Sequence, residues 1–552
     1  MRERRWIVAG RIDAGQEPAS VVQRILRHRG LEAPERQQQF LHPRLRDLAD
    51  PLRIPDMERA VERVETAIKT GESILIYSDY DVDGMSSGAL LYRFLRSLGA
   101  RVRVFIPERI GEGYGLSDKG LERALGAEGA GLVIALDCGT TSHAQVGALK
   151  ESEIDVIILD HHELAAEAPP AVAFVNPQRG ATDHLLATVG IVFKFCHAFM
   201  KLRGAPDLFD LRTHMDLVAL GTVADMVPLL DDNRILVSHG LKQLAQTEHV
   251  GLRALMEVAG LRKDPTPGTI GFVLGPRLNA SGRLAEATAG WELLTTEDES
   301  NARRIAQDLD SLNRERQRLE LEAYREAEAM LEAQPEDERS HCIVVASDRW
   351  HQGVVGIVAS RLQKSRYRPA VVISLHADGS GKGSARSIEG CSMMDALRSC
   401  RDGLHAFGGH AMAAGLEVLP GRVDELRAAL NTWFREHTRE ADYQERLCAD
   451  LELPGEALTP ELAQSIQTLE PFGQKNHAPL FVVREVRMER PRVLAEKHLR
   501  FQAKCGRHAF PVIGFGFAGR GNPSGAFDVA GHWAVDDYTG RPCFTLADWQ
   551  WG

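Results

Sequence analysis

The pattern of apolar and polar positions divides the chain into stretches with different predicted structure. Between residues 73 and 175, short apolar runs alternate with segments whose apolar residues recur at helical spacing. Most of these runs are apolar enough to be buried on both faces, as strands of parallel sheets are. They are residues 74–77, 102–105, 132–136, 156–159 and 173–175. The pattern therefore predicts a doubly wound α/β domain with a parallel sheet.

The remaining stretches predict additional modules. Residues 1 to about 45 are rich in arginine and helical in pattern. Residues 297–334 are highly charged, with Leu and Ala at helical spacing, which predicts a long helix joining two lobes. A second α/β pattern follows, with strands expected at 342–345 and 370–373. After about residue 455, β-rich segments and short turns predict a small barrel such as an OB-fold.

Composition excludes several classes of protein. A chain of 552 residues is too long for a single hydrophobic core, and its 44% hydrophobic and 26% charged residues are typical of globular domains. No signal peptide and no apolar run of about 18 residues is present, so we expect a cytoplasmic protein without a membrane segment. The eight cysteines form no Cys-x-x-Cys pair, which argues against structural zinc and a disulfide framework. With a net charge of −11, nucleic acid would have to bind through local basic patches or cations.

Acidic residues and histidines follow three of the predicted strands. They are Asp79, Asp81 and Asp83 after the first strand, Asp137 after the third, and Asp160, His161 and His162 after the fourth. The carboxyl ends of such strands meet in one crevice, so we expect these side chains to converge. Crowded carboxylates repel one another unless cations hold them ionised. Asp and His ligands without thiolate suit Mn²⁺ or Mg²⁺ better than zinc. Two such ions that share an aspartate would polarise a phosphoryl group and supply hydroxide, which predicts phosphoester hydrolysis.

Each piece of this pattern also has a simpler interpretation. The D-x-D-x-D-G sequence at 79–84 is a fragment of a calcium loop, but a strand precedes it and no glutamate stands at the twelfth position. A His-His pair alone is more often a surface or core feature than a metal ligand. The conjunction of all three segments favours the metal site.

The same segments resemble those of the DHH phosphoesterase superfamily. Segment 216–229 is similar to the fourth segment of that superfamily, whose aspartate is here Asp225. Segments 275–283, 350–359, 408–410 and 470–473 are similar to those of the RecJ family within it. The resemblance spans about residues 40 to 485 and implies a 5′→3′ exonuclease that hydrolyses single-stranded DNA with two ions, Mn²⁺ or Mg²⁺, in recombination and repair.

The resemblance also implies roles for individual residues. It implies the metal ligands Asp81, Asp83, Asp137, His161 and Asp225, with Asp79 and Asp160 as ligands or neighbours of ligands. His162 would face the substrate phosphate, either as a proton donor or as a charge-stabilising contact. Gly408, Gly409 and His410 would form a substrate-binding turn. Candidate phosphate clamps are Arg109, Arg277, Arg283 and Arg386, the last close to Ser384, although surface ion pairs remain an alternative for Arg109 and Arg386.

The pattern and the resemblance together predict a helical segment at 1–45, a DHH catalytic domain at 46–290, a linking helix at 291–337, a DHH-associated domain at 338–440 and an OB-fold at 455–552. The basic stretch 484–507, with Phe481 and Phe501 nearby, would track a DNA backbone and stack bases, although its charge alone fits a solvated face equally well. A helicase and a single-strand-binding protein are the implied partners. The alternatives are a short-oligonucleotide or cyclic-dinucleotide phosphodiesterase and a replication scaffold with a DHH core.

Overall fold

The computed structural model divides into two compact units. The residues that it describes are 4–13, 15–108, 111–112, 115–126, 128–180, 185–284, 287–521, 523–536 and 539–551. Unit 1 consists mainly of Asp310–Leu447, and unit 2 of Ile7–Gly282, Glu286–Leu309 and Cys448–Gly552. No helix in these ranges combines the length and apolar content that a membrane span requires. All eight cysteines are free thiols.

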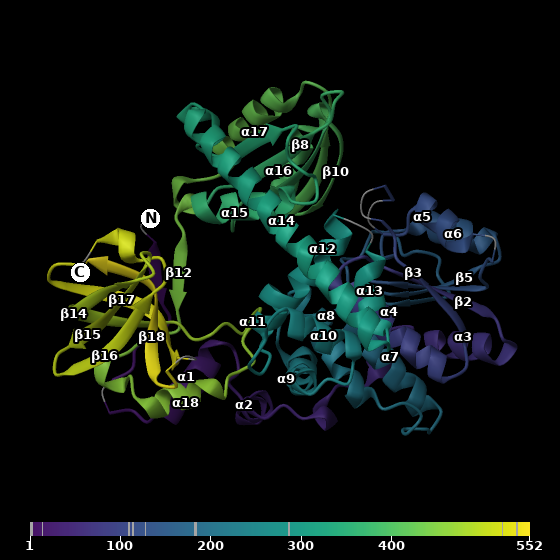
Figure 1. Ribbon diagram of the computed structural model, residues 1–552, viewed down its shortest axis with the longest axis horizontal. Helices are drawn as coiled ribbons and strands as arrows, with labels where there is room; N and C mark the ends of the chain where they lie inside the picture. Colours follow the sequence, from purple (N-terminus) through teal and green to yellow (C-terminus); the bar gives the residue numbers. More distant parts are fainter. Residues whose placement is uncertain are drawn as a thin grey trace. The chain divides into compact units, whose positions relative to one another are not determined.

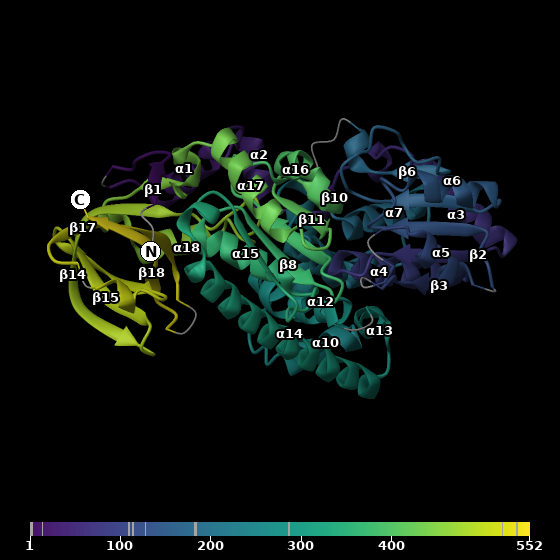
Figure 2. The same ribbon diagram turned by 90° about the horizontal axis from the view of Figure 1, so that it is seen from above.

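A five-stranded parallel sheet forms one part of unit 2. Its strands, in spatial order, are β3 (Arg101–Phe105), β2 (Ser73–Ser78), β4 (Leu132–Leu136), β5 (Asp155–Leu159) and β6 (Ala173–Val175). Figure 1 shows helices on both faces of this sheet, and Figure 2 shows β6 and β3 at its opposite edges. The helices are α3 (Met57–Thr70), α4 (Val82–Ser97) and α7 (Thr188–Leu202) on one face and α5 (Asp118–Leu125) and α6 (His143–Glu151) on the other. The predicted doubly wound parallel sheet is confirmed.

Helices continue the chain after this sheet. They are α8 (Met215–Ala224), α9 (Asp231–Ala245), α10 (Val250–Val258), α11 (Pro267–Thr269), α12 (Gly275–Leu284), α13 (Thr288–Thr295) and α14 (Glu299–Ala333). A π-helical turn, Ile270–Leu274, separates α11 from α12. Helix α14 has 35 residues and confirms the predicted long helix. The boundary between the two units falls within it.

Unit 1 is built on a mixed five-stranded sheet. The strand order is β10 (Leu404–His410), β11 (Ala413–Val418), β9 (Gly381–Arg386), β8 (Ala370–Leu375) and β7 (Ile343–Ser347). Only β7 and β8 pair in parallel. The helices of this unit are α15 (Val355–Arg366), α16 (Met393–Ser399) and α17 (Val423–His437). The second α/β domain is thus confirmed, with both predicted strands in its sheet.

The C-terminal strands close into a barrel. They are β13 (Leu451–Glu452), β14 (Phe481–Leu494), β15 (His498–Cys505), β16 (His508–Gly514), β17 (Ala526–Val535) and β18 (Pro542–Trp551), with α18 (Pro460–Gln467) before β14. Pairing of β14 with β17 closes the sheet, which confirms the OB-like barrel. Phe481 and Phe501 are 0% and 2% exposed in the barrel core, so the prediction that they stack bases is wrong. Both occupy inward positions of strands whose residues alternate between core and surface.

The N-terminal segment packs against this barrel. Helices α1 (Pro18–His28) and α2 (Pro34–Leu41) confirm the predicted helical pattern, and Val21 and Ile25 of α1 belong to the barrel's apolar core. Residues 5–8, however, form strand β1 (Arg5–Val8), which pairs with β12 (Arg446–Ala449). The helical prediction is wrong there. The partner strand lies about 440 residues away in sequence, so local periodicity carries no signal for this pairing.

A buried ion pair joins α7 to α9. Lys194 Nζ lies 2.7 Å from Asp232 Oδ2, and these side chains are 1% and 7% exposed. We expect Lys194→Met to lower the free energy of unfolding by about 3–5 kcal/mol, because the Asp232 carboxylate would stay buried without its cation. The matched control is Lys201→Met on the same helix, whose pair with Asp50 has the same 2.7 Å distance but is exposed. That change should cost less than about 1 kcal/mol. Equal losses in the free energy of unfolding of the two variants, measured by urea denaturation, would contradict the assignment.

Candidate metal centre

Three neighbouring strands of the parallel sheet end at the same level. Ser78 of β2, Leu136 of β4 and Leu159 of β5 are register partners. The following residues continue the ladder, because Asp79 N donates to Leu136 O and Asp137 N donates to Leu159 O, each at 3.1 Å. The acidic residues therefore project from the carboxyl ends of the strands into the crevice where open α/β sheets bind ligands.

Asp81 caps helix α4. Its Oδ1 accepts hydrogen bonds from Asp83 N at 2.9 Å and from Gly84 N at 3.1 Å. These bonds satisfy donors in the first helical turn. A Cβ at Gly84 would lie 2.3 Å from Asp79 O, so only glycine allows this approach. The D-x-D-x-D-G sequence is thus a strand-to-helix turn that holds its three carboxylates close together.

The first turn of α7 supports two of the carboxylates. Asp83 accepts from Thr188 N at 2.7 Å and from Val189 N at 2.9 Å, while Thr188 Oγ1 donates to Asp137 Oδ1 at 2.9 Å. Oriented N–H and O–H donors favour the ionised form of a carboxylate. Thr188 is absent from the predicted site, because it follows no strand and no motif marks it.

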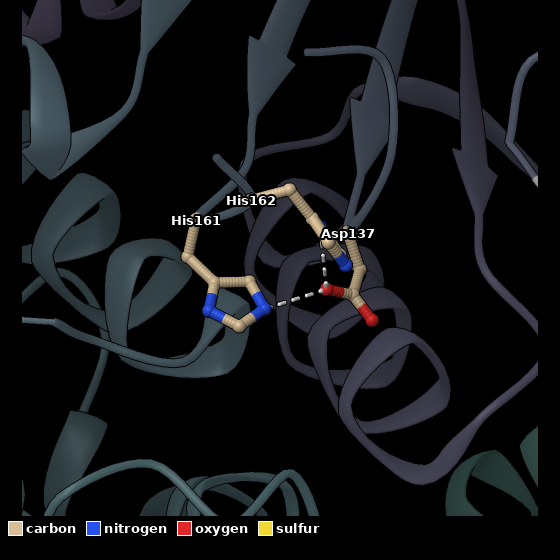
Figure 3. A group of neighbouring side chains, drawn as sticks. All are labelled: Asp137, His161 and His162. Atoms are coloured by element: carbon tan, nitrogen blue, oxygen red, sulfur yellow. Dashed lines mark ion pairs between the residues drawn. The ribbon is translucent and has the colours of Figure 1, made fainter. Parts of the chain in front are cut away.

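Helix α8 brings the fourth predicted segment to the same place. Asp225 directly follows the last residue of α8 as its C-cap. The helix approaches closely at Gly221, where a Cβ would lie 2.8 Å from Asp83 Oδ1. His161 Nε2 lies 3.5 Å from Asp225 Oδ2 and 3.4 Å from Asp137 Oδ1, and Figure 3 shows His161 pointing at Asp137.

The surroundings of His161 and Asp225 also fit a metal ion. His161 Nε2 and Asp225 Oδ2 are buried, and neither atom has a hydrogen-bond partner among the described residues. Buried polar atoms without hydrogen bonds are rare in folded proteins. Because both atoms are metal-ligand types and face one another, a cation between them would satisfy both.

Asp160 is hydrogen-bonded to His162. His162 Nδ1 lies 2.7 Å from Asp160 Oδ1, and Asp160 also accepts from Thr140 N at 3.0 Å. Asn176 Nδ2 donates to His162 O at 2.9 Å and so fixes the backbone of the same residue. Asn176 is missing from the predicted site, although it follows strand β6 directly. The strand-end rule that found the aspartates, applied to β6, would have found Asn176 as well.

Three groups of ligand atoms lie close enough together to hold metal ions, with all atoms of a group within 4.8 Å of one another. They are Asp79, Asp81 and Asp137; Asp83, His161 and Asp225; and Asp137, His161 and His162. Carboxylate oxygens and imidazole nitrogens without thiolate suit Mn²⁺ or Mg²⁺. The described residues therefore fit the predicted cations, and Asp160 belongs to none of the three groups.

Burial and mutual repulsion make the metal-free centre unfavourable. Burial and the charge of Asp81 raise the pKa of Asp83 to about 7. Burial and the charges of Asp83 and Asp81 raise the pKa of Asp225 to about 9, and they raise that of Asp137 well above its ordinary value. Divalent cations would remove this conflict by balancing the carboxylates.

The two histidines differ in charge. Burial lowers the pKa of His162, but the hydrogen bond to Asp160 and its charge outweigh this effect and raise the pKa to about 9. Burial and the charge of His162 lower the pKa of His161 to about 4. Burial alone would raise the pKa of Asp160, yet the hydrogen bond with His162 holds it below its ordinary value. At neutral pH, His161 is therefore neutral, as a metal ligand must be, and His162 is a cation.

We expect the metal-free protein to lose stability between pH 6.5 and 9. The folded-state pKa values of Asp83, Asp225 and His162 lie above their ordinary values, so the folded state binds more protons than the unfolded state in this window. Stability then falls as pH rises through the raised pKa values. Unfolding temperatures by circular dichroism in EDTA should decline over this range, and Mn²⁺ should reverse most of the decline. A rising unfolding temperature in EDTA would contradict the electrostatic picture.

The predicted substrate residues of unit 1 lie on adjacent strands. Gly408 of β10 and Ser384 of β9 both pair with Gly415 of β11, which lies between them. Two residues further along, His410 and Arg386 both pair with Ala413 of β11. Arg386 Nη1 donates to Ser384 Oγ at 2.9 Å. Gly409 has φ +140°, and a Cβ there would lie 2.4 Å from Ala413 O, so glycine is required. The predicted turn is therefore part of a β-hairpin.

The other predicted arginines are placed separately. Arg277 lies on α12 in unit 2, where its Nη1 donates to Val273 O at 2.7 Å. Arg283 belongs to unit 1, and its Nη1 donates to Gly353 O at 3.2 Å. Arg109 lies outside the described residues.

Comparisons with known proteins agree with this geometry. Family models match residues 73–222 (DHH family, N-terminal domain), 340–436 (DHHA1 domain) and 449–547 (RecJ OB domain). The chain is 37% identical over 509 residues to the single-stranded-DNA-specific exonuclease RecJ of Dickeya dadantii, which covers 87% of this chain and 86% of that protein.

Two further relatives extend the comparison. The RecJ exonuclease of Bacillus subtilis is 36% identical over 531 residues, and the match covers 94% of this chain but 66% of that protein. The crystal structure of RecJ from Thermus thermophilus with Mn²⁺ superposes with a TM-score of 0.85 at 30% identity, covering 100% of this chain and 80% of that one. The predicted resemblance and the predicted kinds of domain are thus confirmed.

Proposed function

Because the chain belongs to the RecJ family of single-stranded-DNA-specific exonucleases, we propose that it degrades single-stranded DNA from the 5′ end in recombination and repair. The observation that carries the proposal is the convergence of carboxylates and histidines from three strand ends and α8. A cluster of this kind serves phosphodiester hydrolysis, and the DHHA1 and OB modules of the same chain provide surface for a polymer substrate.

Two cations would be held by different sets of side chains. We assign Asp79, Asp81 and Asp137 to one ion and Asp83, His161 and Asp225 to the other. Bound Mn²⁺ or Mg²⁺ supplies Lewis acidity that polarises a phosphoryl oxygen and activates water at neutral pH. The chain's own contribution is to fix these carboxylates through the α4 cap, the α7 amides and Thr188.

His162 has the charge and orientation to act on the substrate phosphate. Asp160 holds its Nδ1 and keeps the ring protonated at neutral pH. The imidazolium then stabilises negative charge on the phosphate or gives its proton to the leaving oxygen.

We propose that the hairpin of unit 1 binds DNA phosphates. Arg386 presents a guanidinium held by Ser384, and Gly408, Gly409 and His410 lie on the strand at the sheet edge. Guanidinium groups pair with phosphate oxygens bidentately, and glycines allow backbone N–H groups to approach closely. We assign supporting phosphate contacts to Arg109, Arg277 and Arg283. A helicase that exposes single strands and a single-strand-binding protein are the partners that such an activity would need.

The test is digestion of single-stranded DNA labelled at either end, with Mn²⁺ or Mg²⁺ present. We expect the 5′ label to be released first as a short product, while double-stranded DNA of the same sequence stays intact. Release that begins at the 3′ label would overturn the polarity. Faster turnover of a dinucleotide than of a long strand would instead indicate an oligonucleotide phosphodiesterase.

A further inference from the structure

Five residues connect the candidate metal ligand Asp225 to helix α9. We call residues 226–230 the strap. It begins at Met226, whose φ is +62°, and continues to the buried Leu229. Leu229 N donates to Gln474 O at 2.9 Å, so the strap is tied to a segment that follows it by about 245 residues in sequence. That segment, residues 470–476, leads from α18 into the barrel strand β14 and is called the barrel turn below.

The barrel turn is organised by a buried amide. Asn476 is 1% exposed, and its Nδ2 donates to Leu469 O and Pro471 O, each at 2.9 Å. Its Oδ1 accepts from Arg29 Nη1 at 2.8 Å. Gly473 and Asn476 also exchange backbone hydrogen bonds at 2.9 and 3.1 Å. With all these groups satisfied, the turn has one well-defined conformation.

Gly473 of the barrel turn lies directly against the strap. A Cβ at this position would lie 2.5 Å from Leu229 Cδ1 and 3.0 Å from Leu229 Cγ. Leu229 is only 2% exposed, so its side chain has little free space into which it could move. The contact therefore requires glycine for packing, since the backbone at Gly473 is not in the left-handed region.

Arg234, four residues after the end of the strap, is hydrogen-bonded to the same turn. Arg234 of α9 is 2% exposed and donates to Leu469 O at 3.0 Å, to Glu470 O at 2.7 Å and to Phe40 O at 2.7 Å. Its guanidinium also stacks on the Phe40 ring at 3.8 Å. The residues after Asp225 are thus held between α8 and the barrel turn at two successive points.

We propose that the barrel turn is a positioning element for the metal centre, with Gly473 and Asn476 setting the place of Asp225 through Leu229. Leu229 stands four residues after Asp225, so a displacement of the strap passes directly to the carboxylate. The proposal rests on the proposed function for the role of Asp225. In this proposal, the segment that leads into the barrel contributes to metal affinity. This contribution is separate from any binding of DNA by the barrel itself.

The test measures Mn²⁺ binding by the full-length chain without DNA. Gly473→Ala and Asn476→Ala are compared with Gly519→Ala, where a Cβ would have nothing within 4 Å. We expect the first two variants to bind Mn²⁺ about tenfold more weakly by titration calorimetry, as is typical when residues that orient metal ligands are changed. The control should bind as the unmodified chain does. At saturating Mn²⁺, KM for DNA should stay unchanged in all three.

A compensating variant keeps the proposal testable if Gly473→Ala folds poorly. Leu229→Ala removes the side-chain atoms that the new Cβ would meet and keeps the hydrogen bond from Leu229 N to Gln474 O, so Gly473→Ala/Leu229→Ala should fold and bind Mn²⁺ nearly as tightly as the unmodified chain does. Unchanged Mn²⁺ affinity in folded Gly473→Ala and Asn476→Ala, or a double variant with no recovery, would overturn the proposal. Since binding is measured without DNA, a failure of the proposed nuclease activity would show separately in the digestion assay.

Discussion

Replacing Asp137 by asparagine is expected to lower the rate of DNA hydrolysis by about 10³-fold or more. Asp137 belongs to the group of Asp79, Asp81 and Asp137 that we assign to one ion, and it is 3% exposed. Asparagine keeps the size of the side chain and an oxygen that can accept from Thr188, but it removes the negative charge that would hold a cation. Metal polarisation of a phosphoryl oxygen contributes several kcal/mol, and each 1.4 kcal/mol corresponds to a tenfold change in rate.

The matched control is Asp155→Asn at the opposite end of the sheet. Asp155 begins β5 and pairs with Arg63 at 2.6 Å, whereas Asp160 follows the end of that strand. Its replacement should leave the rate nearly unchanged. Asp137→Asn should also unfold in EDTA at the same or a higher temperature, because it removes a buried charge that Asp83, Asp81 and Asp79 repel. A residual rate above about a tenth of the unmodified rate would show that Asp137 is not a metal ligand.

The catalytic sheet was predictable because most of its strands, though not the edge strand β3, are buried on both faces. Residues 132–136 are all apolar and all buried, and such a run in alternation with helices has few other solutions. The strand ends then locate Asp79, Asp137 and Asp160 by a rule of topology alone. The long helix α14 was predictable for a similar reason, since its periodic charges span 35 residues.

The rest of the centre depends on contacts that sequence does not encode locally. Asp225 follows a helix, so strand-end reasoning cannot find it, and only the resemblance to a family indicated it. Thr188, at the start of α7, reaches Asp137, after β4, only through tertiary packing, which no local pattern predicts. Phe481 was misassigned because composition records aromatic residues but not the barrel face on which they lie. The link between Leu229 and Gly473 likewise exists only in three dimensions.

Removing the imidazole of His162 is expected to have the second largest effect on the reaction. His162→Ala should lower the rate of DNA hydrolysis by about 10²–10⁴-fold, the usual contribution of a positioned acid or base. The side chain is 34% exposed, and Asp160 Oδ1 lies 2.7 Å from its Nδ1, which keeps the ring protonated for contact with the substrate phosphate. His143→Ala is the control, because His143 is a half-exposed residue whose only ion pair is with Glu167 among the described residues.

The two roles of His162 predict different responses to a changed leaving group. Sulfur is a good leaving group without protonation, so a substrate with bridging sulfur at the scissile bond does not need a proton donor. If His162 donates the proton, His162→Ala should recover most of its lost rate on this substrate. If His162 only stabilises charge on the phosphate, His162→Ala should lose the same factor in rate, relative to the unmodified chain, on both substrates.

Asp160→Asn provides a third measurement. It weakens the interaction that raises the pKa of His162, so the rate at pH 8 should fall more than the rate at pH 6. A rate for His162→Ala within threefold of the unmodified chain on ordinary DNA would exclude both roles.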